Sequence, residues 1–164
     1  MIRLQFVAGK GISSDLIEWY GAGCVSHVDA VLDDGSLLGA RSDVIGGKPA
    51  GVQIRPPGYE AFSLVIPVVL PVELPAMTAE FYRLLRAEIG KPYDETAILA
   101  FFTGRDWRAP DSWFCSELQA TMLEQCGWFP TPLSTPANKL TPAGLLLALS
   151  ARVPIVLPPT HAAE

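Results

Sequence analysis

The chain has 164 residues, of which 49% are hydrophobic and 18% charged, and this composition excludes a disordered protein. The 12 basic and 17 acidic residues give a formal net charge of -5, so no nucleic-acid partner is expected. The chain contains no uncharged apolar run of about 18 residues, so no membrane span is expected. The length fits one domain, predicted over residues 1–157, followed by a loose tail over residues 158–164.

The N-terminus and the cysteines indicate the compartment. The first ten residues do not combine a charged lead with a long apolar run, so we expect no signal peptide and a cytoplasmic protein, with a phage-encoded or virion-associated protein as the alternative. The cysteines are Cys24, Cys115 and Cys126, an odd number that does not favour a disulfide framework. With His27 and His161 as the only histidines, no zinc-site spacing is present, and neither a metal nor a cofactor is expected.

The first half of the chain reads mainly as strands. Alternation predicts a strand over residues 2–7, and an apolar stripe predicts a short helix over 12–20. Strands follow over 26–32 and 37–41, joined at Asp34-Gly35, which is a strong two-residue hairpin signal.

That hairpin sets an expected register. With a two-residue loop, His27 faces Ser42 and Asp29 faces Ala40, and these side chains share one face of the sheet. Gly39 then falls on the other face.

The second half alternates strands with helices. A short strand is expected over 52–54, and another over 62–70, where Pro67 and Pro71 favour the edge of a sheet. Helices are expected over 78–89, 95–102 and 113–125, the last capped by Asp111-Ser112. Thr141-Pro142 opens a further helix, and a final strand is expected over 152–157. The fold class is therefore α+β.

Cys115 is the strongest candidate for chemistry. It falls in the first turn of a predicted helix, where free backbone N–H groups and the helix dipole favour a thiolate and can hold an oxyanion. Leu118 and Met122 follow at helical spacing, so the sulfur faces the core. The alternative is a buried cysteine that only fills space.

His27 is the natural partner, since His161 lies in the tail. It can act as base toward Cys115 and then as acid toward the leaving group. The group that orients it is Asp29, on the same strand face, or Ser42, across the ladder. The alternatives are a satisfied strand histidine and a solvated carboxylate.

Several motifs, taken in order, resemble a known family. They are Ser26-His27-Val28, the Asp34-Gly35 hairpin ending in Leu38-Gly39-Ala40, Gly51-Val52, Gly90-Lys91-Pro92-Tyr93-Asp94, and Trp113-Phe114-Cys115-Ser116-Glu117-Leu118. Over about residues 20–130 this set resembles the circularly permuted papain-like branch of the NlpC/P60 superfamily, the YiiX/YebB-like group. The resemblance implies a small antiparallel sheet or barrel packed on helices.

The resemblance also implies residue roles. Cys115 matches the nucleophile, His27 the base, and Tyr93 a tyrosine that lines the cleft. Relatives often carry an acidic residue at the position of Gly39, so the usual orienting group is absent here, and Asp29 or Ser42 substitutes for it. Ser42 and Trp113 are also candidates for contact with the substrate.

The expected activity is a cysteine-dependent hydrolase of amide, peptide or ester bonds, working through a thioester acyl-enzyme. An acyltransferase of the lecithin retinol acyltransferase type is one alternative, because those relatives share the permuted order. The other is a catalytically weak binding or assembly protein of a phage or envelope, which the glycine at position 39 favours. The expected partner is a small-molecule, peptide or lipid-like substrate, and the sequence does not predict the oligomeric state.

Overall fold

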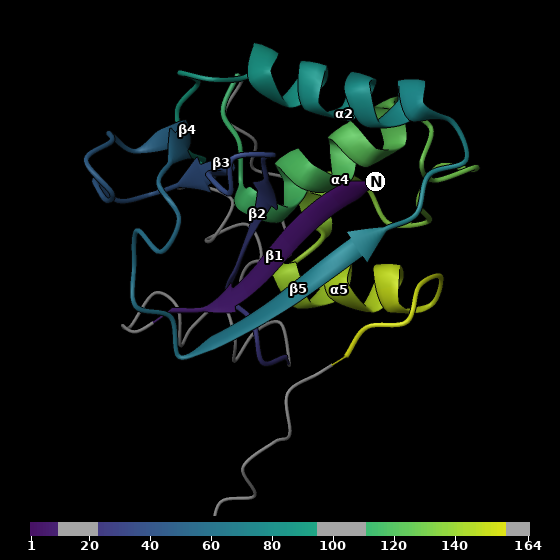
Figure 1. The fold of residues 1–164 in the computed structure, drawn as a ribbon, viewed down its shortest axis with the longest axis horizontal. Helices are drawn as coiled ribbons and strands as arrows, with labels where there is room; N and C mark the ends of the chain where they lie inside the picture. Colours follow the sequence, from purple (N-terminus) through teal and green to yellow (C-terminus); the bar gives the residue numbers. More distant parts are fainter. Residues whose placement is uncertain (10–22, 95–110, 157–164) are drawn as a thin grey trace, which may run out of the picture.

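The computed structural model describes residues 1–9, 23–94 and 111–156 (Figure 1). In this part of the chain, five antiparallel strands form one sheet in the order β4-β3-β2-β1-β5. The strands are β1 Ile2–Ala8, β2 His27–Val31, β3 Leu37–Arg41, β4 Gly51–Arg55 and β5 Leu64–Leu70. The helices are α2 Pro75–Ala87, α4 Cys115–Gln125, the short 3-10 helix η1 Ala137–Lys139, and α5 Pro142–Ser150.

These elements confirm the α+β class, and each of the five strands lies where the sequence predicts one. β5 is an edge strand, as its prolines indicate. The expected strand over 152–157 is wrong for residues 152–156, because the amides of Arg152 and Val153 both donate to the Leu149 carbonyl and continue the turns of α5. The expected helices over 12–20 and 95–102, and the tail over 158–164, lie outside the described residues.

The β2–β3 hairpin corrects the expected register. The Leu32 amide donates to the Ser36 carbonyl (2.8 Å) and the Gly35 amide to the Leu32 carbonyl (3.0 Å), so the loop has three residues rather than two. Gly35 has a φ of 82°, the left-handed conformation that such loops require at their last position. Ala30 therefore pairs with Leu38, and the register is shifted by one residue from the expected one.

This shift changes which side chains meet. Continued along the ladder, the observed register places Gly39 opposite Asp29 and Arg41 opposite His27. Ser42 lies beyond the end of β3 and is exposed. The expectation that Ser42 faces His27 is therefore wrong.

Helix α4 is the centre of the helical layer. It packs on β2 and β3, and α2 and α5 contact it (Figure 1). Leu118, Met122 and Leu123 are buried in the core that it shares with the sheet. The buried Gln119 side-chain amide also donates to the Leu38 carbonyl at 3.1 Å, which ties α4 directly to β3. The position of α4 on the sheet is thus fixed by both packing and a polar contact.

The start of α4 also differs from expectation. The helix begins at Cys115 rather than near Trp113, and its N-cap residue is Phe114 rather than Asp111 or Ser112. Glu117 reaches back to accept a long hydrogen bond from the Phe114 amide (3.5 Å). Cys115 is consequently the first helical residue.

The start of α5 agrees with the sequence and gives a stability prediction. Thr141 is the N-cap residue, and its hydroxyl accepts the Gly144 amide at 3.0 Å. Thr141→Ala is expected to lower the free energy of unfolding by about 1 kcal/mol, because that amide loses its partner. Urea unfolding measures the change. Thr141→Ser keeps the hydroxyl and is the control, and an equal loss in both variants would contradict the capping explanation.

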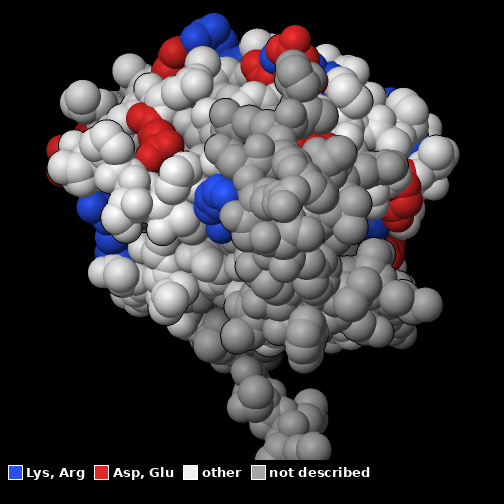
Figure 2. All heavy atoms as spheres, turned by 180° about the vertical axis from the view of Figure 1, so that it is seen from behind, with Lys and Arg blue, Asp and Glu red and all other residues white. Residues whose placement is uncertain are grey.

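Charge is spread in small groups. On the face drawn in Figure 2, basic and acidic side chains of the described residues form small groups, and several groups of opposite charge lie next to each other. None of the described helices is long and apolar enough to cross a membrane.

Candidate active site

Cys115 stands at the junction of helix and sheet. As the first residue of α4, it lies where backbone N–H groups have no carbonyl partner within the helix. Its side chain is buried, with 1% of the residue exposed, and belongs to the same core as Leu118 and Met122. The inward direction of the sulfur agrees with the helical spacing of these three residues.

A three-segment ladder holds the chain that leads into Cys115. In β4, Val52 donates to the Lys91 carbonyl (2.9 Å) and accepts from the Gly90 amide (2.9 Å). The segment over residues 90–94, which contains Gly90 and Lys91, also pairs with Trp113. The Trp113 amide donates to the Pro92 carbonyl (3.0 Å), and the Trp113 carbonyl accepts from the Asp94 amide (3.1 Å). The motifs around residues 51, 90 and 113 are therefore neighbours that position Cys115 against the sheet.

Gly51 is needed for this close approach. Its φ is 102°, and a Cβ at this position would lie 2.4 Å from the Lys91 carbonyl oxygen. Any other residue would push the segment containing Lys91 away from β4.

His27, the first residue of β2, lies beside both a carboxylate and the Cys115 thiol. Its Nε2 lies 2.9 Å from Asp29 Oδ1, with both side chains buried. The N–H on Nε2 is not aligned with that oxygen, so the contact is a close ion pair rather than a directed hydrogen bond. Cys115 lies near enough to the same ring to raise the pKa of His27. The structure thus brings Cys115, His27 and Asp29 together.

The surroundings of His27 favour its charged form. Burial disfavours the cation, but the charges of Asp29 and Cys115 outweigh it and raise the pKa of His27 to about 9. Burial likewise acts to raise the pKa of Asp29, but His27, the Tyr59 hydroxyl and Arg41 hold it below its ordinary value. An imidazolium beside a carboxylate is therefore the favoured state at neutral pH.

Gly39 makes room for the Asp29 carboxylate. A Cβ at position 39 would lie 1.9 Å from Asp29 Oδ1 and 3.1 Å from its Cγ. The carboxylate of β2 thus fills the space that a side chain from β3 would need. The orienting group is carried by the neighbouring strand.

Asp29 has a second partner that sequence reasoning missed. The Tyr59 hydroxyl donates to Asp29 Oδ2 at 2.9 Å. Tyr59 follows β4 in a segment rich in proline and glycine, where no periodicity or spacing marks a site residue.

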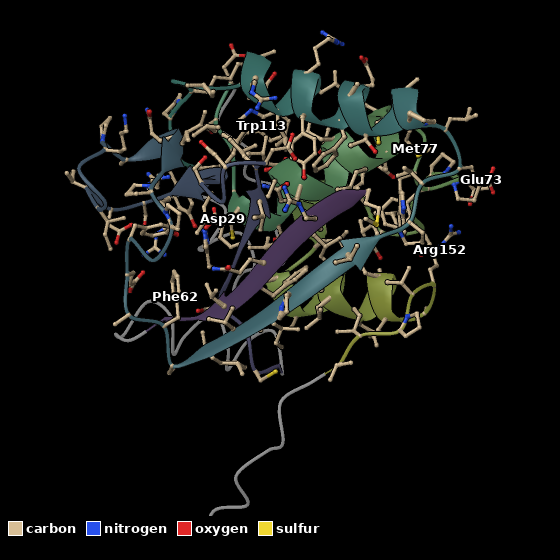
Figure 3. All side chains as sticks on the ribbon, in the orientation of Figure 1. Asp29, Phe62, Glu73, Met77, Trp113 and Arg152 are labelled. Atoms are coloured by element: carbon tan, nitrogen blue, oxygen red, sulfur yellow. The ribbon has the colours of Figure 1, made fainter. Side chains whose placement is uncertain are left out.

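The other predicted site residues, Tyr93, Trp113 and Ser42, have different surroundings. Tyr93 is close enough for the charge of Cys115 to act on it, and burial and that charge raise the pKa of its hydroxyl well above the ordinary value. Trp113 packs beneath the end of α2, where its indole N–H donates to Glu88 (2.6 Å) and Lys91 lies over the ring (Figure 3). Ser42 is exposed, as described above.

A separate pocket lies far from this cluster. It has a volume of about 510 Å³ and includes Glu73, Met77 and Arg152, which lie at the right edge of the view in Figure 3, away from Asp29 near the middle. None of the residues that line it is a cysteine or a histidine. In the described part of the chain, no group of three or more His, Cys, Asp and Glu residues is placed to hold a metal ion.

Comparison with known proteins adds no relative. A scan against protein-family models finds no match, and a search of curated proteins finds no similar sequence. The interpretation of the site therefore depends on its geometry.

Proposed function

We propose that the chain is a cysteine-dependent hydrolase that cleaves amide, peptide or ester bonds through a thioester acyl-enzyme. The observation that carries the proposal is the position of His27 beside both Cys115, at the start of α4, and the buried Asp29. A nucleophile, a base in reach of it and a third group on the base form the arrangement expected for acyl transfer to a side chain.

The first half of the reaction forms the acyl-enzyme. The Cys115 thiolate attacks the substrate carbonyl carbon, and the carbonyl π electrons move to the oxygen. Backbone N–H groups in the first turn of α4 stabilise this developing charge. When the carbonyl reforms, the bond to the leaving amine or alkoxide breaks, and the His27 imidazolium gives that group its proton.

The second half returns the enzyme to its starting state. Neutral His27 takes a proton from water as the water oxygen attacks the thioester carbonyl. The C–S bond then breaks, which releases the carboxylic acid and restores the Cys115 thiolate beside the His27 imidazolium. Asp29 keeps the ring oriented and stabilises its cation in both halves.

The proposed family follows the same residues. The circularly permuted papain-like branch of NlpC/P60 is supported by a histidine strand that precedes the cysteine helix, a small antiparallel sheet and a helix packed on it. The ladder that joins residues 52, 90–94 and 113 gives three of the family-like motifs a shared structural purpose.

Alkylation of Cys115 across pH tests the proposal without knowledge of the substrate. With iodoacetamide, Cys115 is expected to react about tenfold faster than the exposed Cys24 below pH 8, since His27 supports the thiolate. His27→Ala is expected to remove this advantage. Peptide mass spectrometry assigns the label to each cysteine, so Cys24 is a reference within the same chain. Equal rates at Cys115 and Cys24, unchanged by His27→Ala, would refute the catalytic pair.

A further inference from the structure

Tyr59 reaches the candidate site from outside the strands that carry it. It lies in the segment between β4 and β5, yet its hydroxyl donates to Asp29 Oδ2 at 2.9 Å. Asp29 Oδ1 faces His27 Nε2 at the same distance. The two carboxylate oxygens are thus divided between the base and the tyrosine.

The Tyr59 ring is held on several sides. The guanidinium groups of Arg41 and Arg55 lie 5.4 and 5.9 Å from its centroid, and Phe62 packs edge-on at 5.5 Å. A Cβ at Gly46 would come within 2.8 Å of the Tyr59 Cβ, so the backbone turn at Gly46 also packs closely against it. A ring fixed in this way holds its hydroxyl in one direction.

Arg41, the last residue of β3, connects that strand to the segment that carries Tyr59. It forms ion pairs with Asp43 (2.9 Å) and Glu60 (2.8 Å), and its Nη1 also donates to the Tyr59 hydroxyl at 3.4 Å. The two carboxylates match the charge of Arg41, and its hydrogen bond to the hydroxyl helps to hold Tyr59 in place.

The Tyr59 hydroxyl keeps its proton. Burial and the nearby Asp29 carboxylate raise the pKa of Tyr59 above its ordinary value. The hydroxyl therefore stays protonated and donates to the Asp29 carboxylate.

We propose that Tyr59 is a positioning residue of this site: it holds Asp29 Oδ2 so that Oδ1 stays on His27. This inference rests on the proposed function, because its catalytic effect passes through the Cys115–His27 pair. Without the hydroxyl, the carboxylate can rotate about its Cβ–Cγ bond and loses a hydrogen bond that favours its charged form.

Tyr59→Phe tests the proposal, with Tyr82→Phe as the matched control. Phenylalanine keeps the ring contacts and removes only the hydroxyl. The Tyr82 hydroxyl donates to the Val31 carbonyl of the same strand β2 at 2.8 Å and accepts from the Arg3 amide at 3.1 Å, so among the described residues its hydrogen-bond partners are backbone groups. The rate of acylation by p-nitrophenyl acetate is measured against pH, and NMR follows the titration of the Asp29 carboxyl carbon.

Tyr59→Phe is expected to lower the acylation rate about tenfold, the usual effect of removing a hydrogen bond to a charged group. The acid limb of its pH–rate profile is expected to move to higher pH, since Asp29 then takes up a proton more readily. Tyr82→Phe is expected to retain the wild-type profile. An unshifted acid limb in Tyr59→Phe, or the same change in both variants, overturns the positioning role.

The NMR titration separates this inference from the proposed function. If the wild-type protein is not acylated, the hydrolase proposal fails. The contact of Tyr59 with Asp29 is then tested by the titration of Asp29 alone. If Tyr59→Phe leaves that titration unchanged, the inference is wrong.

Discussion

Asp29→Asn is expected to slow acylation of Cys115 by about ten-thousandfold, the loss seen when an aspartate that orients a catalytic histidine becomes an amide. The substitution preserves shape, so packing against Gly39 and Tyr59 changes little. It removes the charge that favours the His27 cation and offers the ring an amide in place of a carboxylate. Burial, which lowers the pKa of His27, is then opposed by Cys115 and by the charge of Asp43 but no longer by Asp29.

The pKa of His27 is the direct readout of this loss. In the native protein it is about 9, and in Asp29→Asn it is expected to fall toward or below the ordinary 6.5. The raised pKa also stabilises the fold. This contribution is complete below about pH 6.5 and disappears as the pH rises through about 9, because the folded state binds the proton more tightly than the unfolded state. The variant should lack this dependence.

Proton NMR of His27 and denaturant unfolding at several pH values measure the two effects. Asp33→Asn is the control, since Asp33 is an exposed carboxylate in the same hairpin whose partner is Arg3. A His27 pKa that stays near 9 in Asp29→Asn would show that Asp29 does not support the cation.

The pairing of Cys115 with His27 is the part of the site that the sequence best predicts. Each signal is local: a cysteine at a helix start, and a histidine on a strand. The ordered motifs predict that the helix and the strand are neighbours, and the described residues place them so.

Which residues face His27 depends on whether the hairpin loop has two or three residues, and short sequence motifs predict this length poorly. Asp34-Gly35 favours a two-residue turn, but Asp33 joins the loop and Gly35 takes the left-handed position at its end. A shift of one residue exchanges the faces of a strand. Gly39 thereby moves from the opposite face to a position against Asp29, and Ser42 loses its place across from His27.

Tyr59 illustrates a second limit. Its role depends on a path of the chain after β4 that brings the residue back over β2, and no periodic pattern encodes such a path. What the sequence does show is a cluster of turn-forming residues around it, including Gly46 and Gly58, both with positive φ. These residues permit the chain to turn in this way but do not indicate where the Tyr59 hydroxyl lies.

Gly39→Ala is expected to reduce acylation of Cys115 by at least a hundredfold, although a methyl group is the smallest possible addition. The new Cβ would lie 1.9 Å from Asp29 Oδ1, far inside van der Waals contact, so the carboxylate or the strand must move. Since Oδ1 is the atom that faces His27, displacement separates the base from its charge partner. The His27 pKa is expected to fall as in Asp29→Asn, and acylation by p-nitrophenyl acetate measures the rate.

Exchanging Asp29 and Gly39 tests whether the carboxylate needs only to fill the space beside His27 or must also come from β2. Asp29→Gly alone should be nearly inactive, because His27 then lacks a carboxylate. Asp29→Gly combined with Gly39→Asp places the carboxylate on β3 and the glycine on β2, with the same pair of positions facing each other in the ladder. The double variant is expected to recover at least tenfold over Asp29→Gly, because a carboxylate from position 39 enters the space next to His27 that Asp29 has left. Additive losses in the double variant would instead show that the carboxylate must come from β2.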